Sequence, residues 1–460
     1  TNSFRRITSD AGGNSEVLNN NFISALFVDE NMIWIGTEKG GVNVLKPDQK
    51  FFTHYVHIPS DKGSISKNPV NAVFEDNEGD LLVGTVEGGL NIRKKGSRDF
   101  IHILAESQRS NSLSHNSVSA VIQDFNMDYW IATWGRGLNF LARQNKYRPV
   151  FTQFMDPEGD SEGISSNFVS ALVSDASTKG LWIGTRSGVD FLSLPERKFY
   201  RLFEGLKIKE ELRFVTGMLI DRQSRLWIGT SNGLFVIHLK KTDIRKGVFA
   251  YEYFKFELSN PESAKIEKIN SIIQTRDGHV WFGSNGHGIY KLEDGSPTYR
   301  FVKIDESEGL IDNVVYGLLE DEAGNLWMST DKGLCAYNPT HGTFRHFTTA
   351  DGLISNQFYW DAYHRGADGK MYFGHVAGLT VFEPLKYSSQ QTTNRVTITR
   401  ITVLNQHIFP ANATQHDTYL KFDETNQLKR IRLHESDKTF SIEFSALSYH
   451  LPHKIKYAYR

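Results

Sequence analysis

The sequence predicts an all-β protein, in which a β-propeller of four-stranded blades is followed by part of a small β-sandwich. Three observations predict it. A four-residue core recurs eight times, the same strand patterns surround each core, and the last part of the chain keeps strand-like alternation but loses the repeat. Aromatic residues and tight turns at regular intervals are typical of such folds.

The repeated core reads Trp34-Ile35-Gly36-Thr37 in its first copy. The eight copies begin at residues 34, 82, 130, 182, 227, 281, 327 and 372, so they stand 48, 48, 52, 45, 54, 46 and 45 residues apart. Periods of this length are typical of repeat proteins whose units need a neighbour to bury their faces. Each period therefore predicts one blade.

Each unit shows four strand signals in a fixed order. An apolar strand such as 118–124 comes first and ends in an acid that caps the following hairpin turn by accepting backbone N–H groups. The Trp-containing strand is second, a strand such as 137–141 is third, and an aromatic strand such as 100–103 is fourth. The acid recurs as Asp29, Asp76, Asp124, Asp175, Asp221 and Asp321.

The repeated Trp, Phe and Gly residues explain how blades would pack. We expect the Trp and Phe side chains to lie between neighbouring blades, and the Gly to let one sheet approach the next closely. The recurrent Trp, Gly and Asp are therefore interpreted as structural residues.

Closure of the ring has two solutions in the sequence. The last repeat lacks an outer strand of its own, because the chain turns polar after Pro384. An open edge invites aggregation, so an N-terminal strand must complete the sheet. If residues 4–7 supply it, the ring has eight blades. If residues 51–55 supply it, the ring has seven, and residues 1–50 are the last blade of a preceding propeller.

The tail, residues 387–460, is predicted to be a different module. Residues 396–404 and 440–444 alternate apolar and polar side chains with period two, which indicates half-buried strands. The pattern stops in mid-course at Arg460, and we expect the native chain to continue.

Composition narrows the functional classes. With 52 basic and 53 acidic residues the formal charge is −1, so no global field attracts nucleic acid or an anionic membrane. Cys335 is the single cysteine, which excludes intrachain disulfides and Cys-based zinc sites. No apolar run of membrane-spanning length is present, and we expect no direct membrane contact by this chain and no cofactor or metal.

The repeat units, which read Leu-Ser-x-Asn-x-Val, then Asp, then Trp-Ile-Gly-Thr, then Gly-Leu, resemble two-component regulator propeller repeats. Residues 351–358, 372–374 and 378–384 resemble the last propeller repeat of these proteins. Residues 440–449 and 457–460 are similar to the triple-tyrosine Ig-like domain that follows it. The order of the three is typical of the periplasmic sensor region of hybrid two-component systems in Bacteroides-type bacteria.

The resemblance implies an architecture and a role. In that family two seven-bladed propellers precede the Ig-like domain, a membrane helix, and kinase and regulator domains. This favours a seven-bladed ring at 51–386, with 1–50 as the last blade of a preceding propeller and 387–460 as the N-terminal part of the Ig-like domain. It also implies a periplasmic location, homodimers, and sensing of an oligosaccharide from glycan breakdown.

Candidate ligand residues lie in loops between the second and third strands, which gather on one face of a propeller. Sugar rings stack on aromatic side chains while their hydroxyls need hydrogen-bond partners, and basic residues favour acidic or sulfated saccharides. Most of these loops follow the common pattern of the repeat and offer no distinctive binding side chain. The candidates are Trp134, Arg136, Arg186, Asn285, His287, Lys332 and His375.

Two other functions compete with sensing. A glycan lyase or glycosidase would need catalytic groups, and a glycosidase needs two carboxylates that flank one bond, whereas the recurrent acids belong to hairpin turns on the other face. The sequence therefore predicts no catalytic residues. A protein-interaction scaffold is the second alternative, and it would require an exposed apolar patch.

Overall fold

The computed structural model describes residues 18–29, 32–45, 51–156, 163–254, 268–293, 299–388, 396–404, 406–409, 420–422, 428–435 and 437–446. These residues are almost entirely β-strands and turns, which confirms the predicted all-β fold class. They separate into two compact units, 1–385 and 386–460.

Seven sheets of four antiparallel strands form within the described part of the first unit. In six of these sheets, strands that are consecutive in the chain are also neighbours in the sheet. Their bounds are β5 Val70–Glu75, β6 Leu81–Thr85, β7 Gly89–Arg93, β8 Ile101–Ile103; β9 Val118–Gln123, β10 Tyr129–Thr133, β11 Leu138–Leu141, β12 Phe151–Phe154; β13 Val169–Asp175, β14 Gly180–Thr185, β15 Gly188–Ser193, β16 Lys198–Arg201; β17 Val215–Ile220, β18 Arg225–Thr230, β19 Gly233–His238, β20 Tyr251–Phe254; β21 Ile269–Gln274, β22 Val280–Ser284, β23 Ile289–Glu293, β24 Arg300–Ile304; β25 Val315–Glu320, β26 Leu326–Thr330, β27 Leu334–Asn338, β28 Thr343–Phe347.

The seventh sheet joins distant parts of the chain. It contains β29 (Phe358–Arg365), β30 (Met371–His375), β31 (Gly378–Phe382) and β4 (Thr53–Tyr55). β4 pairs antiparallel with β31, with Thr380 opposite His54. This is the pairing that the seven-bladed alternative requires.

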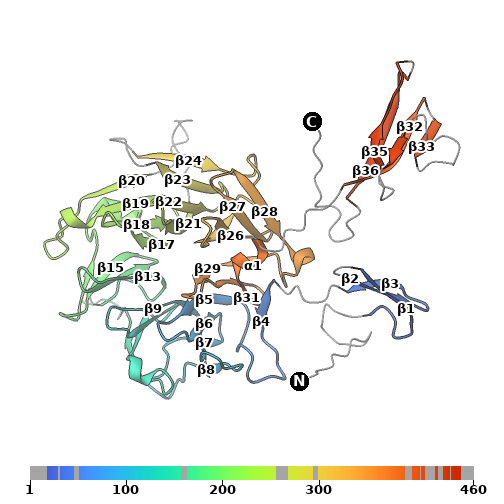
Figure 1. Ribbon diagram of the computed structural model, residues 1–460. Coiled ribbons are helices and arrows are strands. Elements are labelled where there is room, and N and C mark those ends of the chain that lie inside the picture. The colour runs from blue at the N-terminus through green and yellow to red at the C-terminus, as the bar shows by residue number, and fades with distance from the viewer. Residues whose placement is uncertain are drawn as a thin grey trace. The chain divides into compact units, whose positions relative to one another are not determined.

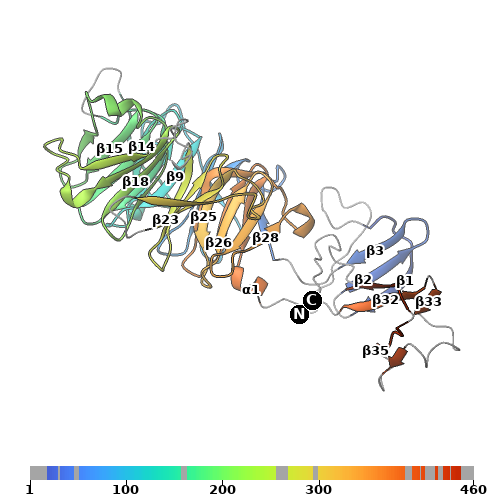
Figure 2. The same cartoon turned by 90° about the horizontal axis from the view of Figure 1, so that it is seen from above.

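The sheets are arranged as a ring. The first strand of each sheet packs against the first strand of the next, from β5 through β9, β13, β17, β21 and β25 to β29, and β29 packs back against β5. These inner strands surround the middle of the ring in Figure 1, and Figure 2 shows the same sheets side by side in the view turned by 90°. The predicted propeller is confirmed.

The recurrent Asp and Trp are joined by a hydrogen bond that the sequence interpretation did not anticipate. In the Asp221 turn, Oδ1 accepts the N–H groups of Gln223 and Arg225, at 3.0 and 2.8 Å, as expected for a cap. Oδ2 accepts the indole N–H of Trp227 at 2.8 Å. The same Trp–Asp bond occurs in three other blades, as Trp130–Asp124, Trp182–Asp175 and Trp327–Asp321. One carboxylate thus shapes the hairpin turn and orients the buried indole ring.

The Gly of the repeated core lets neighbouring blades touch. A Cβ placed on Gly184 would lie 2.5 Å from Cγ1 of Val215, which is on the inner strand of the next sheet. Gly84, Gly229, Gly283 and Gly374 face the next blade in the same way. The predicted close approach is therefore present.

Two further groups of strands lie outside the ring sheets. β1 (Ile23–Asp29), β2 (Met32–Thr37) and β3 (Gly41–Leu45) form a three-stranded sheet with the blade pattern, and its Leu26, Phe27 and Val42 are exposed. In the second unit β32 (Thr397–Val403) pairs with β33 (Gln406–Phe409) and β36 (Phe440–Ser445), while β34 (Leu420–Phe422) pairs with β35 (Leu428–Ile431). A short helix, α1 (Pro384–Ser388), follows β31.

Some predicted features lie outside the described residues. These are the alternative closing strand at 4–7 and the final part of the triple-tyrosine pattern, residues 447–449 and 457–460. In the described part of the chain no helix is both long and apolar enough to cross a membrane.

Candidate functional site

The inner strands carry a β-bulge near their first residue. In six of the sheets two residues stand opposite one Gly, Ala or Ser of the neighbouring strand, as Asn71 and Ala72 stand opposite Gly84. The first residue of each bulge is polar, and in five sheets it donates a hydrogen bond to a carbonyl of the next sheet. The pairs are Asn71–Val118, Ser119–Val169, Ser170–Val215, Thr216–Ile269 and Asn270–Val315.

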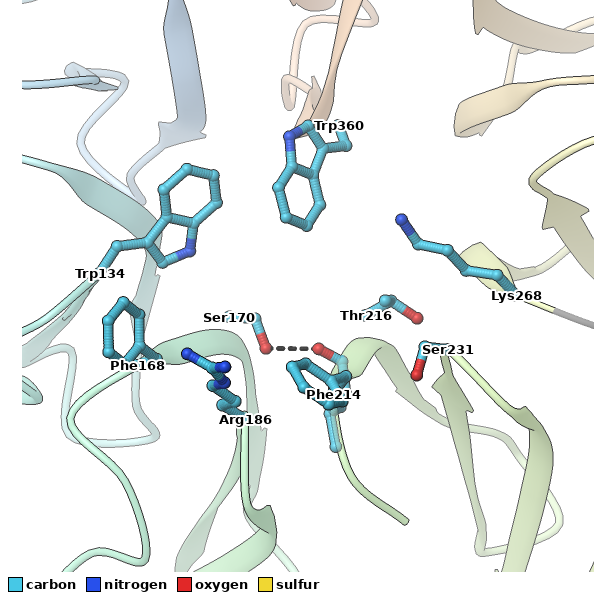
Figure 3. A pocket seen from close by; sticks show the side chains of 10 residues that line it. Trp134, Phe168, Ser170, Arg186, Phe214, Thr216, Ser231, Lys268 and Trp360 are labelled. Carbon is cyan, nitrogen blue, oxygen red and sulfur yellow. Dashed lines mark hydrogen bonds between the residues drawn. The ribbon is translucent and has the colours of Figure 1, made fainter. Parts of the chain in front are cut away.

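The seventh inner strand departs from this pattern. Four residues, 359–362, stand between Phe358, which pairs with His375, and Tyr363, which pairs with Phe373. This is two residues more than in the other six sheets. The backbone of Asp361 has a positive φ of 56°, a conformation that non-Gly residues seldom adopt. The insertion places Trp360 at the cavity shown in Figure 3. Bulges that redirect a side chain in this way are common next to functional sites.

A cavity of about 340 Å³ lies where Trp360 meets the loops of four other sheets. This volume is within the range of small-molecule sites. The polar side-chain groups of its lining are hydroxyls, one guanidinium, one ammonium and the indole N–H groups of two Trp residues. Figure 3 shows the lining, which is Trp134, Phe168, Ser170, Arg186, Phe214, Val215, Thr216, Ser231, Lys268 and Trp360.

Two indole rings stand on one side of this cavity. The ring centres of Trp134 and Trp360 are 4.9 Å apart and their planes are inclined by 39°. The ammonium of Lys268 lies 5.1 Å from the centre of the Trp360 ring, within the range of a cation–π contact. The indole nitrogen of Trp134 faces the cavity in Figure 3.

Arg186 is held between two aromatic rings. Its guanidinium carbon lies 5.5 Å from the centre of the Phe168 ring and 5.2 Å from that of Phe214. Both phenyl groups are exposed, by 45% and 44%, and Phe214 has a positive φ of 53°. Exposed aromatic side chains on such backbone mark a candidate functional site.

Backbone hydrogen bonds connect the loops that carry these side chains. Arg186 N–H donates to the Phe168 carbonyl, and Phe214 N–H donates to the Arg186 carbonyl, both at 3.0 Å. Ser231 N–H donates to the Phe214 carbonyl at 3.1 Å. Four loops of two adjacent sheets are therefore fixed relative to one another before any ligand arrives.

The structure brings together two of the seven predicted site residues, Trp134 and Arg186. Lys332 and His375 are engaged elsewhere. Lys332 Nζ lies 2.7 Å from an oxygen of Glu306 in an ion pair. His375 is fully buried at the end of β30, where burial lowers its pKa to about 3. Neither side chain lines the cavity.

The other three predicted residues also lie off the cavity. Arg136 and Asn285 are exposed, and the main chain of Asn285 bridges to Val314. His287 is half-buried, and its backbone N–H donates to Ser284 Oγ at 3.1 Å. The second-to-third-strand loops thus form only part of the site.

Sequence reasoning missed Trp360, Lys268, Phe168 and Phe214. One of them left a signal in the spacing. The Asn before the inner strand precedes the repeated core by 13 to 15 residues in five copies, and by 14 at Asn68, Asn116 and Asn313, but Asn356 precedes Tyr372 by 16. The two extra residues are the insertion that carries Trp360.

A cluster of acids elsewhere has the spacing of a metal site but already holds a cation. Ligand oxygens of Asp76, Glu78 and Asp80 lie within 4.8 Å of one another. The ammonium of Lys146, which is 2% exposed, reaches all three, at 2.7, 2.8 and 2.6 Å. Burial alone would lower the pKa of Lys146, but these hydrogen bonds raise it above its usual value.

The Lys146 cluster also explains an irregular repeat. This blade has Leu82 in place of the core Trp, so Asp76 has no indole N–H to accept. Lys146 Nζ and the hydroxyl of Tyr129, at 2.7 and 2.6 Å, bond to Asp76 Oδ2 instead. We interpret the cluster as structural.

The repeats match a known family. Residues 265–286 and 309–332 match the two component regulator propeller, which confirms the resemblance stated above. The chain is 27% identical over 285 residues, 61% of its length, to Histidine kinase P4 of Formosa agariphila, and this match covers 20% of that protein.

Solved structures share the fold. The extracellular domain of the hybrid two component system BT3049 from B. thetaiotaomicron matches 94% of this chain and 54% of that one, with a TM-score of 0.68 and 21% identity. The extracellular domain of BT4673 from the same organism matches 95% of this chain and 55% of that one, with a TM-score of 0.56 and 18% identity. The chain thus spans about half the length of these domains and a fifth of the kinase.

Proposed function

We propose that this chain is a ligand-sensing, non-catalytic part of a hybrid two-component sensor, placed in the periplasm. Its ligand is an oligosaccharide released by glycan breakdown. Binding is passed through the Ig-like domain to a membrane-linked histidine kinase, in a full-length protein that acts as a homodimer. The sensor role is supported by the matched repeats and by relatives that are a histidine kinase and extracellular domains of two-component systems.

The observation that carries the ligand proposal is the pair formed by Trp134 and Trp360. Their inclined rings, 4.9 Å apart, offer apolar faces to one cavity. Sugar C–H faces stack on such rings, and the neighbouring Arg186 and Lys268 supply hydrogen-bond donors. A closed apolar core would need no donors, so this combination favours recognition of a polar ring compound.

The lining supports binding without turnover. Among the described residues that line the cavity, none carries a carboxylate. Glycoside hydrolysis requires a pair of carboxyl groups on either side of the bond. The recurrent acids meanwhile shape hairpin turns and bind indole N–H groups, as Asp221 does.

The position of the cavity suits a sensor. Its lining belongs to five of the seven ring sheets, so one ligand would contact several blades at once. A ligand shifts a conformational equilibrium only by binding one arrangement better than another. A site shared by several sheets can supply this difference, because their relative positions alter its shape.

Calorimetric titration of the purified chain with a panel of oligosaccharides tests the proposal. We expect at least one to bind, with affinity lost by about tenfold or more in Trp134→Ala and in Trp360→Ala, since each variant loses an aromatic face on which the sugar ring stacks. Trp134→Phe, which keeps a ring, serves as the matched control and should retain most of the affinity. Unchanged binding in both alanine variants would remove this cavity from consideration, and product formation would contradict the non-catalytic role.

A further inference from the structure

We infer that the cavity selects an anionic saccharide, whose carboxylate or sulfate group is bound between Arg186 and Lys268 while its ring lies against Trp134 and Trp360. This inference rests on the proposed function and names the chemical class of its ligand. Four features of the described residues carry it.

The first feature is the charge of the lining. Arg186 and Lys268 are its charged side chains, and both are cations. In the described part of the chain neither is within ion-pair distance of a carboxylate, whereas Lys332, Arg213 and Arg201 near the same face pair with Glu306, Glu210 and Asp156. These three cations are paired with carboxylates, whereas the two that line the cavity keep their charge for a ligand.

The second feature is the hydrogen-bonding character of the available groups. A guanidinium, an ammonium and an indole N–H are donors only. Two hydroxyls of the lining already donate to backbone carbonyls of the next sheet, Ser170 to Val215 and Thr216 to Ile269. A neutral sugar hydroxyl needs to donate as well as accept. A carboxylate or sulfate only accepts, so it matches the donors that Arg186, Lys268 and Trp134 offer.

The third feature is the fixed position of Arg186. Contacts with Phe168 on one side and Phe214 on the other restrict the plane of its guanidinium. Backbone hydrogen bonds between Arg186 and both phenylalanines, one donated and one accepted by Arg186, fix the loop itself. A donor fork whose orientation is set before binding loses little entropy when it meets a planar carboxylate or a sulfate.

The fourth feature concerns Asp361, an acid that interacts electrostatically with Lys268. Asp361 follows Trp360 in the insertion. Burial raises the pKa of Asp361 well above its usual value, although Lys268 opposes the shift. Because burial disfavours the charged form of Asp361, this acid cancels less of the positive charge of Lys268 than an exposed carboxylate would.

The test compares acidic sugars with neutral counterparts of the same ring. The probes are di- and trigalacturonate with their carboxyl-reduced forms, and sulfated chondroitin disaccharides with their desulfated, carboxyl-reduced forms, titrated calorimetrically into the full chain at two ionic strengths. We expect an acidic member to bind at least about tenfold more tightly than its neutral counterpart, with affinity that falls as salt rises.

Charge-removing variants then assign the effect. Arg186→Gln and Lys268→Gln remove the positive charge and keep a polar side chain, and each should cost about tenfold or more in affinity for the acidic probe. Arg136→Gln removes an exposed charge from the same face outside the cavity, and it should leave affinity unchanged. Thermal unfolding of each variant checks that the ring is intact.

The outcomes separate the two proposals. If neutral and acidic probes bind equally and Arg186→Gln and Lys268→Gln have no effect, the anionic specificity is wrong while oligosaccharide sensing stands. If Arg136→Gln weakens binding as much as Arg186→Gln, a diffuse field and not this cavity selects the anion, and the inference fails. If neutral sugars bind nowhere on the chain and acidic ones bind independently of Trp134 and Trp360, the proposed function itself fails.

Discussion

At the scale of single residues, the last repeat shows what happens when one conserved bond of the blade is missing. In the other blades a Thr or Ser at the end of the core donates to the carbonyl across the turn, as Thr133 does to Gly137 at 2.9 Å and Thr330 to Gly333 at 2.8 Å. His375 stands at this position in β30. Its Nδ1 accepts the Ala377 N–H at 3.2 Å, and its buried Nε2 has no partner among the described residues.

Replacing His375 with Thr is expected to stabilise the propeller in mild acid. Burial, with a smaller effect of nearby His54, lowers the pKa of folded His375 to about 3. The unfolded chain, whose His has a pKa near 6.5, therefore takes up the proton first as pH falls, and stability is lost between about pH 6.5 and pH 3. The loss is roughly 2 kcal/mol by about pH 5, and His375→Thr should remove most of it.

Urea unfolding at about pH 7 and about pH 5 measures this difference. His364, whose pKa burial lowers to about 4, is a second source of acid sensitivity and remains in the variant. His375→Thr should therefore reduce the slope of stability against pH without abolishing it. Exposed His341→Thr is the control and should leave the slope as it is. An equal slope in wild type and His375→Thr would contradict the assigned cause.

At the scale of elements, the sequence predicts the strands well but not the detail of their first residues. The hairpin between Asp and Trp and the close contact at Gly could be predicted because these residues recur in the repeats. A residue that recurs at the same place in each repeat has similar surroundings in each blade. The two-residue insertion in β29 occurs once, so no other copy indicates where it leads. It appears only as a longer spacing between Asn356 and Tyr372, and the projection of Trp360 depends on the bulge geometry.

The contact between successive sheets can be tested at the core Gly. Gly184→Ala would place a methyl group 2.5 Å from Cγ1 of Val215, and overpacking of this kind costs about 1–3 kcal/mol. Denaturant unfolding should show the loss. In the Val215→Ala background the 2.5 Å clash with Cγ1 is gone, and the nearest remaining atoms are Cβ of residue 215 at 3.1 Å and Cβ of Ala171 at 3.2 Å, so Gly184→Ala should there cost less. Additive losses in the double variant would show that the two sheets do not meet at these residues.

At the scale of the whole molecule, a short segment near residue 50 decides how the ring closes. Phe52 is 4% exposed, and its ring centre lies 5.3 Å from that of Phe382 and 5.8 Å from that of Phe347. β4 supplies the outer strand of the seventh sheet next to it. We propose that residues 51–386 are one seven-bladed propeller, and that 1–50 and 387–460 belong to other modules.

Two shortened chains test this division. A chain that begins at Phe51 should keep the unfolding transition of the ring, whereas one that begins at Ser60 loses β4, exposes the edge of β31 and is expected to unfold earlier and self-associate. Differential scanning calorimetry and light scattering measure both. Phe52→Ala in the full chain should lower stability by about 3–5 kcal/mol, as for other buried Phe side chains. Equal behaviour of the two shortened chains would contradict closure by β4.

The sequence by itself determined that this protein is a propeller, because the period of the repeat requires a neighbour for every blade and the repeated Trp, Gly and Asp residues act through local turns and contacts. It also indicated two residues of the cavity, Trp134 and Arg186, from loops that differ from the other copies. Only the tertiary structure decided that Trp360 and Lys268, far apart along the chain, meet them, because a ring brings the tops of separate blades together and no local pattern records that distance.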